Sequence, residues 1–362
     1  MTSGGATGGP ATRAAERTSK TADSELPHGR RMPIVFGPVH SRRLGWSLGI
    51  NNVPPKTCSY ACIYCQVGAT TRASVRRGAY LEPSVVARSA LERVRACRDC
   101  GQTIDYATFV PDGEPTLDVN LGEAIRAVRT PDVRVAVLTN ASLLWREDVR
   151  EDLTAADWVS LKVDTVDERT WTQLNRPIRR LDLAVVLAGI RRFAREFHGY
   201  LATETMLVAG VNDDEEGVRN VADFVRSLDP SHAYISIPIR PATVPWARPP
   251  LSDVALQAAE VFAGTGLRST LLSGDQVDKG FAPSPDAIEG LIGILAVHPM
   301  TERAARAYVT RSGDRWRRIE GLIDEGLVVR TPRGLTTYLC LDHARLRDRN
   351  GAVTDCGRSR RK

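Results

Sequence analysis

The sequence predicts an α/β protein whose parallel sheet curls into an open or partial barrel, followed by a smaller C-terminal module. From about residue 44 to residue 272, short apolar or β-branched runs alternate with stretches of helical period, which is typical of repeated β-α units. After Gly280 the pattern changes to three helical stretches and a hairpin. A chain of 362 residues is long enough for one large domain and a small partner.

The candidate strands are short and rich in apolar or β-branched residues. They are Leu44–Ile50, Tyr106–Val110, Val133–Thr139, Trp158–Val163, Leu201–Leu207 and Tyr234–Ile239, with Arg268–Leu272 as a further candidate. The intervening helical patterns are Pro83–Cys97, Leu121–Val128, Leu181–Phe197, Glu215–Ser227 and Asp253–Phe262. Right-handed crossovers would close six or so such units into a partial (β/α)6 barrel. Ligands of such folds lie at the carboxyl ends of the strands.

The C-terminal module is predicted to contain three helices and a hairpin. Pro285–Val297 is the first helix, Thr301 caps the second and Ser312 caps the third, which runs through Trp316. Leu327–Val329 and Leu335–Leu339 then flank a turn at residues 332–334, and the whole is similar to a winged-helix domain. The expected division is a disordered tail over 1–31, a core domain over 32–275, a winged-helix-like domain over 281–340 and a basic tail over 341–362.

Charge and composition narrow the class of protein. The net charge is +6, but residues 1–31 hold five basic and three acidic groups and residues 341–362 hold seven basic and three acidic groups. The body is therefore close to neutral, and the basic residues are expected to be two solvated tails. The sequence has no secretory signal pattern and no apolar run of membrane-spanning length, so we expect a cytoplasmic protein without a membrane partner.

Three of the seven cysteines lie together, as Cys58, Cys62 and Cys65, directly after the first strand candidate. A long chain without an export signal favours metal or redox chemistry over a disulfide framework. Three thiolates at this spacing can hold three corners of an iron–sulfur cube and leave the fourth iron open. A structural zinc site is disfavoured, because no fourth ligand lies nearby in the sequence.

This cysteine pattern resembles that of the radical S-adenosylmethionine (SAM) superfamily. The resemblance implies a 4Fe-4S cluster on Cys58, Cys62 and Cys65, whose open iron binds SAM, and a partial radical SAM barrel. It also implies that the residues binding SAM stand at strand ends. These are Tyr64 near the adenine, Asp112, Gly113, Glu114 and Pro115 in a Gly-Gly-Glu-type motif, Asn140 with Thr139, and Ser160, Lys162 and Asp164. Taken singly, each is also an ordinary polar residue of a loop or strand end.

A narrower resemblance extends over roughly residues 34 to 245. The stretches 36–49 and 174–177, the latter reading Leu-Asn-Arg-Pro, are similar to bacterial proteins grouped with wyosine-type tRNA-modifying synthases. Those synthases bind a second cluster through cysteines upstream of the triad, and this chain has none before Cys58. The segment Val208–Asp213 resembles the adenine-contacting segment of the superfamily, and it reads equally as a glycine turn before a helix cap.

Other polar residues have two interpretations each. Cys97 and Cys100 could together bind an auxiliary cluster or metal, but a simpler interpretation is that Cys97 is a buried structural thiol. Cys340 and Cys356 have no assignable partner. Arg42 and Arg43 either bind an anionic substrate or are solvated, and His40 is expected at the surface. Basic residues near Trp316, namely Arg311, Arg315, Arg317 and Arg318, are either a phosphate-binding face or part of a nearly neutral module.

The functional expectation is an enzyme that cleaves SAM reductively to a 5′-deoxyadenosyl radical and modifies RNA, a peptide or a metabolite. The expected partners are reduced flavodoxin or ferredoxin as electron donor and an unidentified substrate, with tRNA or another macromolecule among the candidates. The alternatives are an iron–sulfur-sensing winged-helix regulator and an activase that installs a glycyl radical. No catalytic residue beyond the cofactor-binding ones is assigned.

Overall fold

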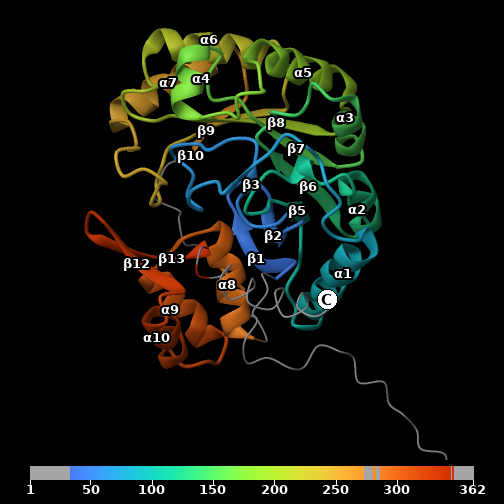
Figure 1. Cartoon of the computed structure of the whole chain (residues 1–362), viewed down its shortest axis with the longest axis vertical. Helices are drawn as coiled ribbons and strands as arrows, with labels where there is room; N and C mark the ends of the chain where they lie inside the picture. The colour runs from blue at the N-terminus through green and yellow to red at the C-terminus, as the bar shows by residue number, and fades with distance from the viewer. Residues whose placement is uncertain (1–32, 273–279, 283–285, 344, 346–362) are drawn as a thin grey trace, which may run out of the picture.

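The computed structural model describes residues 33–272, 280–282, 286–343 and 345. The expected tail over 1–31 and Cys356 lie outside the described residues. Within the described part, one eight-stranded sheet has the order β1-β2-β5-β6-β7-β8-β9-β10. Figure 1 shows this sheet curled around the centre of the molecule with helices on its outer face.

The barrel strands follow the expected sequence runs closely. They are β2 (Gly45–Ile50), β5 (Tyr106–Phe109), β6 (Arg134–Thr139), β7 (Trp158–Lys162), β8 (Tyr200–Met206), β9 (His232–Ser236) and β10 (Ser269–Leu272). Each neighbouring pair from β2 to β10 is parallel. The sheet is therefore the curled, incomplete barrel that the alternation of elements predicted.

Helices cover the outer face of this sheet. They are α1 (Pro83–Asp99), α2 (Leu121–Val128), α3 (Glu147–Leu153), α4 (Glu168–Leu174), α5 (Leu183–Glu196), α6 (Glu215–Arg226) and α7 (Ser252–Gly264), with a short 3-10 turn, η1 (Pro115–Leu117). The sequence analysis missed α3 and α4, since each spans only two turns and carries few apolar residues. Asp167 caps α4 by accepting from the amide of Thr170 at 2.8 Å.

The barrel begins one strand earlier than expected. β1 (Val35–Ser41) pairs antiparallel with β2 and lies at the edge of the sheet. Its Gly37-Pro38 sequence argued against a strand, but proline is tolerated on an edge strand, where its nitrogen need not donate. The ladder is irregular between Phe36 and Val39, so the proline falls in a bulge.

Two apolar layers lie on opposite faces of the sheet. The main core lies between the sheet and the helices and includes Leu48, Phe109 and Phe193. A smaller cluster inside the curl contains Ala136, Trp158 and Tyr234 and packs the interior. Trp158, Ser160 and Lys162 alternate along β7 and so share this inner face. The interior is therefore apolar at the start of β7 and becomes polar toward its carboxyl end.

The C-terminal module contains α8 (Ala287–Val297), β11 (Met300–Thr301), α9 (Glu302–Arg311), α10 (Arg317–Asp324), β12 (Val328–Arg333) and β13 (Thr336–Leu341). Thr301 caps α9, as expected, by accepting from the amide of Ala304. The cap assigned to Ser312 is wrong, because Ser312 ends α9 and α10 begins after Trp316. The hairpin turn lies at 334–335, since Arg333 already pairs with Thr336.

The module has its own apolar core and also packs against the barrel. Ile294, Met300 and Ile319 are buried within the module, and α8 contacts β1. Arg333 of β12 donates to the carbonyl oxygens of Pro238 and Arg240, and the hydroxyl of Tyr338 donates to that of Ile239 at 3.1 Å. The module is thus tied to the segment that follows β9. Among the described residues, no helix is long and apolar enough to cross a membrane.

Candidate functional site

The three cysteines lie in the long loop between β2 and α1, which contains only the short strands β3 (Thr57–Cys58) and β4 (Arg72–Ala73). The loop pairs on one side with the segment that follows β5. The amide of Lys56 donates to the carbonyl of Asp112 at 2.6 Å, and the amide of Glu114 donates to that of Thr57 at 3.0 Å. A Cβ on Gly113 would lie 2.3 Å from the Thr57 carbonyl oxygen. Gly113 therefore permits two backbone segments to come into contact here.

On its other side the cysteine loop pairs with the Leu-Asn-Arg-Pro segment after α4. The amide of Ile63 donates to the carbonyl of Leu174 at 2.9 Å, and the amide of Ile178 donates to that of Ser59 at 3.0 Å. Tyr60 forms a β-bridge with Pro177. The stretch 174–177 thus has a structural role, because it orders the loop that presents the cysteines.

The three thiols share one buried, polar neighbourhood. Burial raises the pKa of Cys58 well above its usual value and that of Cys62 to about 12, with the carboxylates of Glu114 and Asp164 adding to the respective shifts. Each of these two thiols also interacts electrostatically with Cys65. The protein therefore favours the neutral thiols of Cys58 and Cys62, so cluster binding has to release protons.

Glu114 organises the ends of β5 and β6. Its buried carboxylate accepts from the hydroxyls of Thr116 and Thr139, each at 2.6 Å, and from the amide of Asn140 at 2.7 Å. Burial raises the pKa of Glu114, and these donors oppose the shift. The carboxylate thus fixes the loop that follows β5 relative to the end of β6.

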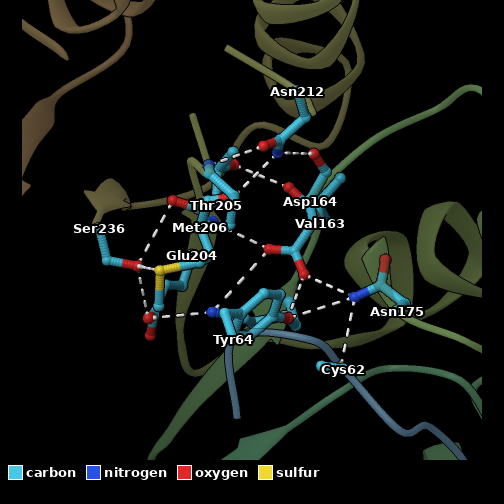
Figure 2. Close-up of polar contacts among 12 residues, drawn as sticks. Cys62, Tyr64, Val163, Asp164, Asn175, Glu204, Thr205, Met206, Asn212 and Ser236 are labelled. Carbon is cyan, nitrogen blue, oxygen red and sulfur yellow. Dashed lines mark hydrogen bonds and ion pairs between the residues drawn. The ribbon is translucent and has the colours of Figure 1, made fainter. Parts of the chain in front are cut away.

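A second buried network centres on Asp164, which follows β7 (Figure 2). Its carboxylate accepts from the Tyr64 hydroxyl, from the Asn175 amide nitrogen at 2.8 Å and from the backbone amide of Met206 at 2.9 Å. Asn212 donates to the carbonyls of Asp164 and Met206 at 2.9 and 2.8 Å. The network joins the cysteine loop to the carboxyl ends of β7 and β8.

The inner face of β7 and β8 carries a charged cluster. Lys162 contacts Glu204 at 3.1 Å and Asp164 at 3.8 Å, and Arg43 forms an ion pair with Glu204. Burial alone would raise the pKa of Glu204, but Arg43 and Lys162 hold it below its ordinary value. The Lys162 ammonium also lies 5.0 Å from the centre of the Tyr64 ring. Lys162 therefore remains a cation inside the barrel.

A cavity of about 370 Å³ opens at this end of the barrel. Tyr64, Cys65, Lys162 and Met206 line one part of it. Another part is lined by residues of β1, β2 and the turn between them together with residues of the module, among them His40, Arg42, Arg43, Ser47, Val297 and His298. The cavity thus brings together the last cysteine, the charged cluster and the C-terminal module.

Several sequence candidates lie elsewhere or have other contacts. The Asn140 amide donates to Cys58 Sγ and Ser59 Oγ at 3.4 and 2.9 Å. Ser160 is buried in β7 and is not among the described residues lining the cavity. Cys97 is buried in the core, as expected, whereas Cys100 is exposed at the end of α1. His40 is exposed and packs edge-on against Trp46.

The first residues of the expected basic tail have contacts in the structure. β13 extends to Leu341, which is buried, and His343 Nδ1 lies 2.8 Å from Asp112 Oδ2. The same carboxylate pairs with the Lys56 ammonium at 3.1 Å. Asp112 therefore joins the cysteine loop to the C-terminal end of the described chain, a contact that no local sequence pattern indicated.

Sequence reasoning also missed Lys56, Asn175 and Glu204. Lys56 precedes the triad and is 3% exposed with φ 59°. Asn175 is buried and contacts Cys62, and the partly buried Glu204 contacts Lys162. The signal for Glu204 was a charged residue inside an apolar strand pattern. Asn175 was visible only as part of the Leu-Asn-Arg-Pro stretch.

Comparisons with known proteins agree with this geometry. The sequence model of the Radical SAM superfamily matches residues 52–222, which hold the cysteine loop and the strands from β5 to β8. A UPF0026 protein of Methanocaldococcus jannaschii is 39% identical over 300 residues, which cover 83% of this chain and 93% of that protein. The chain belongs to the radical SAM superfamily. Its full-length likeness to this relative also places it among the UPF0026 proteins.

Other similar proteins are more distant. A UPF0026 protein of Synechocystis is 33% identical over 58% of this chain and 77% of its own length. The structure of a radical SAM methyltransferase from Sphaerobacter thermophilus has a TM-score of 0.49 at 18% identity, covering 62% of this chain and 66% of that one. A structure titled TYW1 with a lysine-pyruvate adduct bound has a TM-score of 0.47 at 16% identity, covering 60% and 73%.

Radical SAM enzymes use a 4Fe-4S cluster and SAM, and they need an electron donor and a substrate. Among the described residues, no group of three His, Cys, Asp or Glu side chains is arranged for a single metal ion. A cluster differs from a single ion, because each cysteine binds its own iron. Three partly buried thiols in one loop, ordered by pairing on both sides, fit such a group.

Proposed function

We propose that this radical SAM enzyme holds a 4Fe-4S cluster on Cys58, Cys62 and Cys65 and cleaves SAM reductively to start hydrogen abstraction from its substrate. The observation that carries the proposal is the pairing of the cysteine loop with two segments, one after the strand β5 and one at the end of the helix α4. When bound, such a cluster supplies one electron to the sulfonium of SAM, which gives methionine and a 5′-deoxyadenosyl radical.

The protein contributes binding, orientation and exclusion of water. The backbone of Asp112–Pro115 is proposed to bind the amino group of SAM, since Glu114 already has protein donors and holds this loop in place. Tyr64 and Lys162 line the cavity beside Cys65 and are proposed to contact the adenine and the carboxylate of SAM. Asn140 and Asp164 hydrogen-bond to neighbouring strand ends, from which these contacts are made, and Ser160 is buried in β7 beside them.

The substrate is proposed to occupy the other part of the cavity. His40, Arg42 and Arg43 line this part together with Val297 and His298 of the C-terminal module. We propose that the module, which runs from α8 through β13, is a winged-helix-like domain and that it presents the substrate. RNA, a peptide and a metabolite all remain candidates, and reduced flavodoxin or ferredoxin is the proposed electron donor.

An anaerobic assay tests the proposed reaction. We expect the reconstituted protein to form 5′-deoxyadenosine from SAM after reduction with dithionite, with absorbance near 410 nm from the cluster, a value on the order expected for such centres. The Cys58→Ala, Cys62→Ala and Cys65→Ala variants should each lose both signals, because three thiolates are needed. Cys97→Ala is the matched control, since Cys97 lies in the core, and it should keep both signals.

The cluster absorbance and the 5′-deoxyadenosine measurement also distinguish this proposal from the alternative functions. A cluster that reconstitutes fully in a variant lacking all three cysteines would overturn the ligand assignment. A cluster without any 5′-deoxyadenosine would favour a sensing role, and a stable organic radical on a partner protein would favour a glycyl-radical activase. Mass spectrometry of tRNA, peptides and metabolites from a deletion strain would then identify the substrate class.

A further inference from the structure

Each of the three cysteine sulfurs lies next to one side-chain N–H donor, and the donors come from different parts of the chain. The donors are Asn140 Nδ2 to Cys58 Sγ at 3.4 Å, Asn175 Nδ2 to Cys62 Sγ at 3.5 Å and Lys56 Nζ to Cys65 Sγ at 3.8 Å. They belong to the end of β6, the end of α4 and the start of the cysteine loop. One donor for each sulfur indicates a role at the sulfurs themselves.

The Asn140 amide is held by a second pair of contacts. Its oxygen accepts from the backbone amide of Ser142 at 3.0 Å, which directs its nitrogen toward Ser59 Oγ at 2.9 Å and Cys58 Sγ. A flipped amide would place two donors against each other, so the orientation follows from the network. Asn140 is thereby a fixed donor to Cys58.

Asn175 is buried between the cysteine loop and Asp164. Its nitrogen lies 2.8 Å from the Asp164 carboxylate, 3.2 Å from the Tyr64 hydroxyl and 3.5 Å from Cys62 Sγ (Figure 2). All three neighbours can accept a hydrogen bond, so the nitrogen and not the oxygen of the amide faces them. The asparagine of the Leu-Asn-Arg-Pro stretch therefore has a partner in the cysteine loop.

Lys56 adds a positive charge beside Cys65. Asp112 lies 3.1 Å from the ammonium and fixes its position. Lys56 thus donates to sulfur as a cation, whereas the two asparagines donate as neutral amides.

We infer that Lys56, Asn140 and Asn175 are positioning residues that set the reduction potential of the cluster through N–H contacts to its cysteine sulfurs. Hydrogen bonds to cluster sulfurs and nearby charge are among the factors that determine such potentials. A donor stabilises the sulfurs more when the cluster carries the extra negative charge of the reduced state. Each donor therefore makes the cluster easier to reduce. This inference rests on the proposed function, since it requires the cluster on the three cysteines.

The test is a redox titration of the reconstituted protein followed by electron paramagnetic resonance of the reduced cluster. We expect Lys56→Met to lower the ratio of reduced to oxidised cluster about tenfold at a fixed ambient potential, which corresponds to about 59 mV for one electron. Lys56→Gln keeps an N–H donor without the charge, and its shift should be smaller. Lys56→Arg keeps both the N–H donor and the positive charge, so its cluster should have the wild-type potential.

Asn140 offers a pair of near-isosteric variants. Asn140→Leu removes the donor without adding charge, and Asn140→Asp retains the acceptor for the Ser142 amide while removing the N–H. Both should lower the reduced fraction, by about threefold for Asn140→Leu and by more for Asn140→Asp, because loss of the hydrogen bond to sulfur and added negative charge both disfavour the reduced cluster. Asn52→Leu is the control, since Asn52 is a buried asparagine whose amide donates to Pro115 and Asp118.

The iron content of the variants distinguishes a failure of the proposed function from a failure of the inference about the three donors. If the three cysteine variants bind as much iron as wild type, the proposed function fails before this inference is reached. If Lys56→Met, Asn140→Leu and Asn140→Asp hold a full cluster at the wild-type potential, the inference is wrong. Loss of the cluster in every Lys56 and Asn140 variant would also overturn it, because donors that only tune a potential are not required for assembly.

Discussion

Asp118 shows how burial of one carboxyl group makes stability depend on pH. It follows η1, is 1% exposed, and accepts from the backbone amide of Asn120 at 3.0 Å and from the side chain of Asn52 at 3.3 Å. Burial raises its pKa from 3.8 to about 6, although these donors and Arg77 oppose the shift. The folded state therefore binds a proton more tightly than the unfolded state between these two pH values.

We predict that Asp118→Asn changes the pH dependence of unfolding. In the wild type, the contribution of Asp118 to the free energy of unfolding falls as pH rises from about 4 to 6, by about 3 kcal/mol for a shift of this size. The variant cannot titrate there, so it should become more stable relative to wild type across this interval. Urea unfolding at several pH values measures the difference, and parallel curves for the two proteins would contradict the prediction.

The role of a single residue could be predicted from the sequence where the residues it acts with lie close to it along the chain. The cysteine triad and Glu114 were recognised because their motifs are local. The contacts of Asn175 with Cys62 and of Lys162 with Glu204 join different elements, and only the folded sheet brings them together. Lys162 was expected to bind SAM at a strand end, but its carboxylate partner on β8 could not be inferred from β7 alone.

At the scale of elements, Gly113 determines how closely two segments can approach. A Cβ there would lie 2.3 Å from the backbone oxygen of Thr57, and that carbonyl accepts from the amide of Glu114. A backbone atom cannot move aside as a flexible side chain can. The pairing between the cysteine loop and the segment after β5 therefore requires glycine at this position.

We predict that Gly113→Ala destabilises the protein by about 1–3 kcal/mol, the range typical of overpacking, and lowers iron incorporation by separating the two segments. Gly264→Ala is the matched control, because no heavy atom lies within 4 Å of the added Cβ and the residue is in α7. That control should be neutral or stabilising by roughly 0.5–1 kcal/mol. Thermal unfolding and iron analysis measure both, and equal behaviour of the two variants would contradict the prediction.

Most barrel strands and long helices could be predicted, because their patterns repeat over several residues. The exceptions have physical reasons. β1 contains Gly37-Pro38 and is an edge strand, and α3 and α4 are too short for a clear helical period. The cap of α10 was misplaced because a serine followed by a polar turn reads as a helix start, whereas Ser312 ends α9.

At the scale of the whole molecule, the C-terminal module is held on the barrel by hydrogen bonds to the segment after β9. Arg333 supplies two of them, to the carbonyls of Pro238 and Arg240. Arg330 lies on the same strand but pairs with Glu302 inside the module. Substituting Arg333 therefore tests how the module is held on the barrel, whereas substituting Arg330 tests the stability of the module itself.

We predict that Arg333→Ala increases hydrogen exchange at the amides of Ile237 and Ile239, because the carbonyls of this segment lose their partners and the module detaches more often. Arg330→Ala should leave exchange at these amides close to wild type while affecting the module itself. Mass spectrometry of peptides spanning residues 231–247 provides the measurement. Equal protection of this peptide in the two variants would show that Arg333 does not hold the module in place.

The contact between Asp112 and His343 has a consequence for biosynthesis. The two partners lie far apart in the sequence, so they can meet only after the ribosome has translated the chain as far as His343. Asp112 also pairs with Lys56, the donor to Cys65. We therefore expect nascent chains that stop before His343 to accept iron more slowly than chains that include it, which would delay maturation of the cofactor until this residue has been translated.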